Sequence, residues 1–129
     1  KNRWPYLAEN DFSGTWKNVK SVGFAFRGAI KLISTEHSIM VQTSAAVLLI
    51  IAGFYFDISH EEWLIQTLAI GLVLGIEGIN TAVEKVADFI HPEFHDRIGF
   101  IKDIAAGAVM FAAAAAIVVG LLIYVPKFL

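Results

Sequence analysis

Four polar residues share one face of an otherwise apolar segment, and they define the acidic stripe: Glu77, Asn80, Glu84 and Asp88. At about 100° per residue on a helix, they fall within an arc of roughly 80°. If this segment crosses a membrane, burying each carboxylate costs on the order of 3 kcal/mol, and the three acids also repel one another. The acidic stripe therefore predicts a metal ion, a basic partner or a proton path beside it.

The acidic stripe belongs to a strongly apolar chain. The 129 residues are 57% hydrophobic, with a mean hydropathy of +0.64. Three apolar runs, at about residues 39–56, 63–88 and 104–125, are long enough to span the hydrocarbon core of a bilayer. The sequence therefore predicts an all-α integral membrane protein with three transmembrane helices, in a single domain over residues 1–129. It has no cysteine, so it offers no disulfide or thiolate metal site.

A segment before the first run, at about residues 13–34, is amphipathic. Its apolar side comprises Trp16, Val19, Val22, Gly23, Phe26, Ile30 and Ile33. Its basic side comprises Lys17, Lys20, Arg27 and Lys31. The pattern predicts a helix lying along the membrane surface, whose cations either anchor anionic lipid or contact a phosphate. The first thirty residues lack the apolar core of a signal peptide, so we expect the spans themselves to direct insertion.

The basic residues indicate how the chain is oriented. Six precede the first span, and Lys85, Arg97 and Lys102 flank the turn between the second and third spans. Residues 57–62 contain no Lys or Arg, and only Lys127 follows the third span. Because basic loops stay in the cytoplasm, we expect the N-terminus and the Asp88 end of the acidic stripe on the cytoplasmic side.

A cytoplasmic pocket with these groups could carry out phosphoryl transfer at a lipid interface. Carboxylates bind Mg²⁺, which often bridges to substrate phosphates, and lysines neutralise phosphate charge. A carboxylate beside a hydroxyl can accept its proton. The sequence contains neither a Walker A motif nor the glycine loop of protein kinases, so a nucleotide would be held in another way. Nothing in the sequence indicates a nucleic-acid partner.

Two blocks in the sequence resemble those of the small bacterial integral-membrane diacylglycerol kinases. Residues 77–88, EGINTAVEKVAD, are similar to the family pattern E-x-x-N-[ST]-A-[IV]-E-x-x-x-D. Residues 102–109, KDIAAGAV, resemble the family's K-D-x-A-A-G-A-V block, and the resemblance extends back through residues 26–28 and Glu36. Pro92, His95 and the Ala-Ala-Gly block are similar to the Gram-positive branch, which is known for undecaprenol kinases. The Gram-negative branch phosphorylates diacylglycerol.

The resemblance implies a role for each matching residue. Glu77 matches the general base that takes the proton of the lipid hydroxyl, and Glu36 and Glu84 match metal-binding carboxylates. The nucleotide and phosphate site is matched by Lys20, Arg27, Asn80, Asp88, Lys102 and Asp103. The resemblance further implies an ATP- and Mg²⁺-dependent lipid kinase that forms a homotrimer in the bacterial cytoplasmic (inner) membrane, with its active site facing the cytoplasm.

Three positions depart from the Gram-positive branch. That branch often carries Asn, Arg and His where this chain has Ser38, Met40 and Gln42. The sequence therefore does not identify the nucleotide contacts of this stretch. It also does not distinguish diacylglycerol from undecaprenol as the acceptor lipid, because an apolar lipid tail leaves no signature in apolar spans.

Two functions of other classes compete with the lipid kinase. In a small proton- or cation-coupled transporter the acidic stripe would be the ion path, but the Lys102-Asp103 block would have no role. A non-enzymatic assembly subunit would need neither the stripe nor its asparagine. At the level of single residues, Asn80 and Thr81 could simply hydrogen-bond between helices. His91 and His95 could form a metal pair, although the sequence offers no third ligand.

Overall fold

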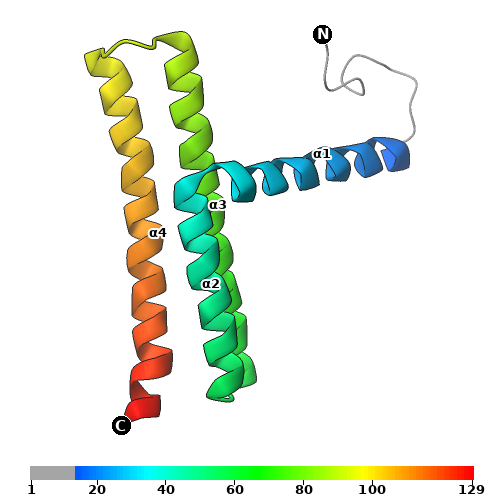
Figure 1. Cartoon of the computed structure of the whole chain (residues 1–129), viewed down its shortest axis with the longest axis vertical. Helices are drawn as coiled ribbons and strands as arrows, with labels where there is room; N and C mark the ends of the chain where they lie inside the picture. Colours follow the sequence, from blue (N-terminus) through cyan, green and yellow to red (C-terminus); the bar gives the residue numbers. More distant parts are fainter. Residues whose placement is uncertain (1–13) are drawn as a thin grey trace. The chain divides into compact units, whose positions relative to one another are not determined.

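The computed structural model describes residues 14–129, with side chains from residue 18 onward, and this part of the chain forms four α-helices and no strand. The helices are α1 (Gly14–Thr35), α2 (His37–Tyr55), α3 (His60–Ile90) and α4 (Asp96–Phe128), as Figure 1 shows. Helices α2, α3 and α4 are each long and apolar enough to cross a membrane. For the described residues, the prediction of an all-helical protein with three helices long and apolar enough to cross a membrane is confirmed.

Helix α1 belongs to one compact unit, Lys1–Glu36, and the other three helices form a second unit, His37–Leu129. Within α1, the hydroxyl groups of Ser34 and Thr35 donate to backbone carbonyls one turn earlier, at 2.8 and 2.6 Å. The apolar side chains that the sequence assigns to one face, such as Val22 and Phe26, are exposed. The side chains of Trp16 and Lys17 lie outside the described ones, and the surface role of α1 stays a prediction.

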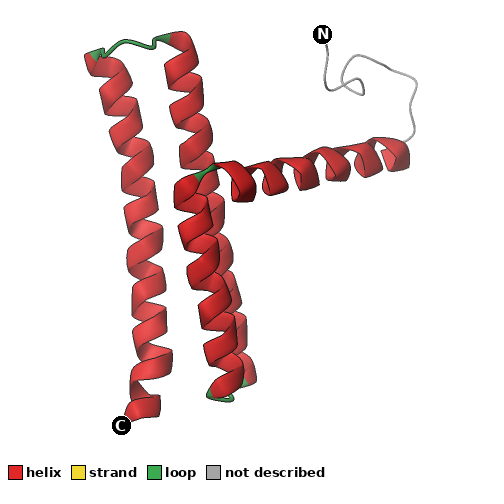
Figure 2. Ribbon diagram, in the orientation of Figure 1, coloured by secondary structure: helices red, strands yellow, loops and turns green. Residues whose placement is uncertain are grey.

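A tight turn joins α2 to α3. Ile58 N–H donates to the carbonyl of Gly53 at 3.1 Å, and Asp57 N–H donates to that of Phe54 at 3.3 Å, which is the Schellman pattern of a helix C-terminus. Asp57 occupies the left-handed position with φ of 51°, which Asp tolerates better than most residues. Ile58 is buried behind the turn. The turn therefore ends α2 and reverses the chain within residues 56–59. Figure 2 draws this turn as a short green loop between the two helices.

A reciprocal cap then starts α3. The Ser59 hydroxyl accepts from Glu62 N–H at 3.1 Å, and the Glu62 carboxylate accepts from Ser59 N–H at 2.9 Å. Just inside the helix, the Trp63 ring packs against Gly53 so closely that a Cβ at Gly53 would lie 2.6 Å from a ring carbon. Only glycine fits there without moving the ring, so Gly53 lets α2 and α3 pack closely beside the turn.

Helices α3 and α4 both extend beyond the predicted spans. Helix α3 continues to Ile90, and α4 already begins at Asp96, where the ring of His95 accepts from Arg97 N–H at 3.0 Å. Capping groups rather than hydropathy decide these ends, which is why the apolar runs underestimated the helices. At 1.5 Å per residue, α3 and α4 are about 46 and 50 Å long, whereas α2 is about 28 Å.

The three helices of the second unit pack as neighbours along α3 (Figure 1). Few side chains are fully buried between them, and those on α2 and α4 are small or branched: Ile39, Ala46, Gly53, Ala112 and Ile123. Most of the large apolar side chains on α2, α3 and α4 are exposed. Such a surface suits contact with lipid or with other apolar helices.

Candidate active site

Glu77 is buried within the membrane-spanning part of α3, and only 7% of its surface is exposed. Its carboxylate oxygen Oε2 accepts a hydrogen bond of 2.9 Å from the Ser38 hydroxyl. Ser38 lies in the first turn of α2, so α2 begins level with Glu77 and covers α3 only from there to the turn at Asp57. The structure thus joins the candidate base to a residue 39 positions earlier, which the sequence marked only as a departure from the Gram-positive branch.

The next members of this face are also buried. Asn80 is 9% exposed and Thr81 is 6% exposed. Within the described part of the chain, the Asn80 carbonyl oxygen Oδ1 is buried and has no hydrogen-bond partner. The alternative in which Asn80 simply bonds to a neighbouring helix is therefore not realised at this oxygen. A buried amide oxygen without a partner is a group that a ligand can satisfy.

Further along α3 the acidic stripe becomes exposed. Glu84 and Asp88 are both exposed, as is Asp103 on α4. Asp88 accepts a hydrogen bond of 2.7 Å from the Lys102 ammonium group, an ion pair that links α3 to α4. The structure therefore brings together Asp88 and Lys102, two residues that the sequence assigned to one phosphate site.

The acidic stripe meets the ligand preference of Mg²⁺, although the described residues contain no cluster of three or more His, Asp or Glu side chains. Mg²⁺ commonly takes one or two carboxylates and completes its shell with water and substrate phosphates. The exposed Glu84 carboxylate and the unpartnered Asn80 oxygen lie four residues apart on one helix face, and both are oxygen donors.

Other predicted site residues belong to the unit of α1. Glu36, Lys20 and Arg27 lie in Lys1–Glu36, so their roles stay predictions. Within this unit the Arg27 guanidinium lies 5.6 Å from the centroid of the Phe24 ring.

The two loop histidines serve the turn between α3 and α4. The His91 ring contacts the Glu93 carbonyl at 2.6 Å, and the His95 ring caps α4. These contacts explain both residues without a metal.

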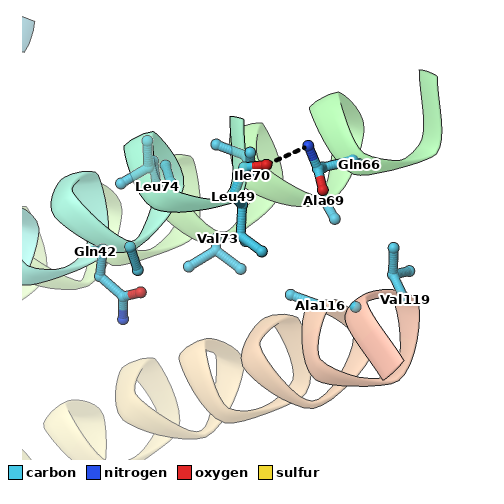
Figure 3. A pocket seen from close by; sticks show the side chains of 12 residues that line it. Gln42, Leu49, Gln66, Ala69, Ile70, Val73, Leu74, Ala116 and Val119 are labelled. Carbon is cyan, nitrogen blue, oxygen red and sulfur yellow. Dashed lines mark hydrogen bonds between the residues drawn. The ribbon is translucent and has the colours of Figure 1, made fainter. Parts of the chain in front are cut away.

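A second polar group lies near the opposite end of α3, where the sequence predicted no site. Gln66 is 3% exposed; its amide nitrogen donates to the Leu49 carbonyl at 3.3 Å, and its amide oxygen accepts from the Tyr124 hydroxyl at 2.6 Å. Figure 3 shows the bond to Leu49 at the edge of a cavity of about 90 Å³ between α2, α3 and α4. A glutamine within an apolar run was the available signal, because a buried amide needs partners.

Comparison with known proteins places these residues in a family. The model of the prokaryotic diacylglycerol kinase family matches residues 23–124. An undecaprenol kinase of Bacillus subtilis (strain 168) is 38% identical over 108 residues, which cover 84% of this chain and 88% of that protein. A diacylglycerol kinase of Synechocystis sp. is 31% identical over 110 residues, which cover 84% of this chain and 63% of that protein.

The diacylglycerol kinase of Escherichia coli (strain K12) is more distant, at 25% identity over 109 residues, which cover 84% of this chain and 89% of that protein. The matched region includes α2, α3 and most of α4, and therefore the whole acidic stripe with Lys102 and Asp103. The chain belongs to the prokaryotic diacylglycerol kinase family and is a lipid kinase.

Proposed function

We propose that the protein transfers the γ-phosphoryl group of ATP, with Mg²⁺, to the hydroxyl group of a membrane lipid alcohol. The observation that carries this proposal is the change of environment along the acidic stripe. Glu77 is buried and hydrogen-bonded to Ser38, whereas Glu84, two turns further along the same face, is exposed. A buried carboxylate suits the hydroxyl of a lipid, and an exposed one suits a nucleotide from water.

The helix lengths support this division. At about 28 Å, α2 nearly matches the hydrocarbon core, which is about 30 Å thick. Glu77 faces the first turn of α2 and so lies near one border of that core. A lipid alcohol holds its hydroxyl group at the same border. Beyond Glu77, α3 and α4 extend without α2, as Figure 1 shows. By their positions in the sequence, Glu84, Asp88 and Lys102 belong to this part of α3 and α4.

In the proposed reaction the oxygen of the lipid hydroxyl attacks the γ-phosphorus, and Glu77 accepts the proton that this hydroxyl loses. The bond from the γ-phosphorus to the bridging oxygen breaks, and ADP leaves. Glu84 would hold Mg²⁺, with Glu36 as the second carboxylate that the family resemblance implies, and the bound ion would neutralise charge on the phosphates. Asn80, Lys102 and the remaining nucleotide-site residues bind the phosphates and the nucleotide: Lys20, Arg27, Asp88 and Asp103.

We favour undecaprenol as the acceptor. The undecaprenol kinase relative is 38% identical to this chain, whereas the two diacylglycerol kinases are 31% and 25% identical. Diacylglycerol is the second candidate, because two of these three relatives carry that name. Membership of a kinase family favours either acceptor over the transporter or the assembly subunit.

We also propose a homotrimer in the bacterial cytoplasmic membrane, with the N-terminus and the active site on the cytoplasmic side. The orientation rests on the distribution of Lys and Arg, and the trimer on the family resemblance. The exposed apolar side chains of α2, α3 and α4 are compatible with packing between copies.

The test is transfer of labelled phosphate from γ-labelled ATP by purified protein in mixed detergent micelles. Undecaprenol and diacylglycerol are offered separately at equal mole fraction, with Mg²⁺ and with excess EDTA. We expect Mg²⁺-dependent phosphorylation of both, with a higher kcat/KM for undecaprenol. Preference for diacylglycerol would reverse the acceptor assignment, and transfer that persists in EDTA would exclude the metal role.

A further inference from the structure

We infer that Ser38 is a positioning residue for Glu77, an assignment that rests on the proposed role of Glu77 as the base. The Ser38 hydroxyl lies 2.9 Å from Glu77 Oε2 and is the donor in this contact, because an ionised carboxylate only accepts. In the sequence Ser38 stands out only as a departure from the Asn of the Gram-positive branch, and no role beside Glu77 follows from that.

The contact distinguishes the two oxygens of the Glu77 carboxylate. Ser38 occupies Oε2, so the other oxygen, Oε1, is the one that takes the proton from the lipid hydroxyl. Fixing one oxygen also fixes the plane of the carboxylate, and a general base must hold its accepting oxygen within hydrogen-bond reach of the proton. Ser38 therefore acts through Glu77 and does not itself touch the reacting atoms.

Its place in the fold makes Ser38 suited to this task. It lies in the first turn of α2, and Ile39 beside it is 3% exposed, which holds this turn against the bundle. Glu77 is 7% exposed and lies on the long helix α3. Both partners stand on helices rather than on loops, so the carboxylate is held by a side chain that is itself anchored on a second helix.

A simpler role for the same hydrogen bond is to hold α2 against α3. The Tyr124 hydroxyl offers a matched comparison, because it bonds α4 to α3 and α2 through Gln66 and Leu49, far from Glu77 along the chain. Tyr124→Phe removes a hydrogen bond between helices without touching the acidic stripe. If Ser38 only joined helices, the two variants would behave alike.

The experiment measures kcat and KM for ATP and for the lipid alcohol in micelles. It compares the parent protein, Ser38→Ala, Ser38→Thr, Tyr124→Phe, Glu77→Gln and the double variant Ser38→Ala/Glu77→Gln. We expect Ser38→Ala to lower kcat about tenfold with an unchanged KM for ATP, as for loss of one orienting hydrogen bond. Ser38→Thr keeps the hydroxyl and should stay within about threefold of the parent. Tyr124→Phe should keep the parent kcat.

The double variant decides whether Ser38 acts through Glu77. Once the base is gone, losing Ser38 should cost nothing more, so the double variant should match Glu77→Gln alone. An equal loss in both backgrounds, a parent-like kcat in Ser38→Ala, or failure of Ser38→Thr to restore it would overturn the assignment. Ser38→Cys, a weak donor of similar size, repeats the test if Ser38→Ala does not fold. A parent without turnover would overturn the proposed function as well.

Discussion

Gln66 and Asn80 are both amide side chains buried on α3, but only the side-chain carbonyl oxygen of Gln66 has a hydrogen-bond partner in the described part of the chain. The Gln66 oxygen accepts from Tyr124, and its nitrogen donates to Leu49. The Asn80 oxygen has no partner in the described part of the chain. The charges nearby follow this contrast only in part: Glu62 caps α3 and pairs with Lys127, and Asp88 pairs with Lys102, whereas Glu84 is exposed.

The contrast separates an end of α3 whose buried amide is satisfied within the chain from an end whose buried amide is not. Leaving a buried acceptor without a partner costs roughly 1–3 kcal/mol, so a bundle built only for stability would avoid it. The end with Gln66 meets its hydrogen-bonding needs from within the chain and acts as a clamp on three helices. The end with Asn80 leaves a buried acceptor available, which fits the proposal that a nucleotide and a metal bind there.

The largest effect is expected at Glu84. Glu84→Gln removes the charge proposed to hold Mg²⁺. Without the metal the negative charge of the phosphates is not neutralised, so the rate of phosphate transfer should fall by about a thousandfold. The matched control is Glu61→Gln, the same change in the exposed first turn of α3, which should keep parent activity. Activity at ordinary Mg²⁺ in Glu84→Gln would remove this residue from the metal site.

Glu77→Gln should have the next largest effect. Loss of a general base lowers kcat by at least about a hundredfold, while the KM for ATP should stay near that of the parent. The amide can still pair with Ser38, so the folded protein should persist. The measurement is steady-state kinetics with the lipid alcohol as variable substrate. A near-normal kcat would leave Glu77 with a structural role only.

A pair of leucine substitutions tests the comparison through stability. Gln66→Leu leaves the Leu49 carbonyl and the Tyr124 hydroxyl with fewer partners, and should lower the free energy of unfolding by about 1 kcal/mol. Asn80→Leu removes an oxygen that has no partner, so it should leave stability equal or higher but reduce activity. Denaturation by increasing SDS fraction in mixed micelles measures both. The opposite order of stabilities would break the contrast between the two ends.

The smallest effect is expected at Lys127. Its ammonium lies 3.2 Å from the Glu62 carboxylate, and both side chains are more than a quarter exposed. Exposed ion pairs contribute little, so Lys127→Met should shift the denaturation midpoint less than Gln66→Leu and leave kcat unchanged. A drop in activity would show that the two ends of α3 are coupled.

The helices were predictable from sequence because apolar runs of sufficient length have few other structures open to them in a bilayer. The pairing of Asp88 with Lys102 was also within reach, since both fall in blocks assigned to one site. The contacts of Ser38 and Gln66 were not predictable. Periodicity indicates which face of a helix a residue occupies, but not the axial register of that helix relative to its neighbour. The exposure of Glu84 likewise depends on where α2 begins to pack against α3, which is a property of the tertiary structure.

The turn between α2 and α3 has a consequence for biosynthesis. Its Schellman bonds, the Ser59 cap and the contact of Gly53 with Trp63 all join residues within about ten positions of one another. Such local contacts close quickly. We therefore expect α2 and α3 to enter the bilayer as one hairpin, which delivers Glu77 together with its hydrogen-bond donor. The Glu77 carboxylate would then have its hydrogen-bond partner as soon as α3 enters the membrane. Helix α4, which is synthesised last, would pack against a pair of helices that has already formed.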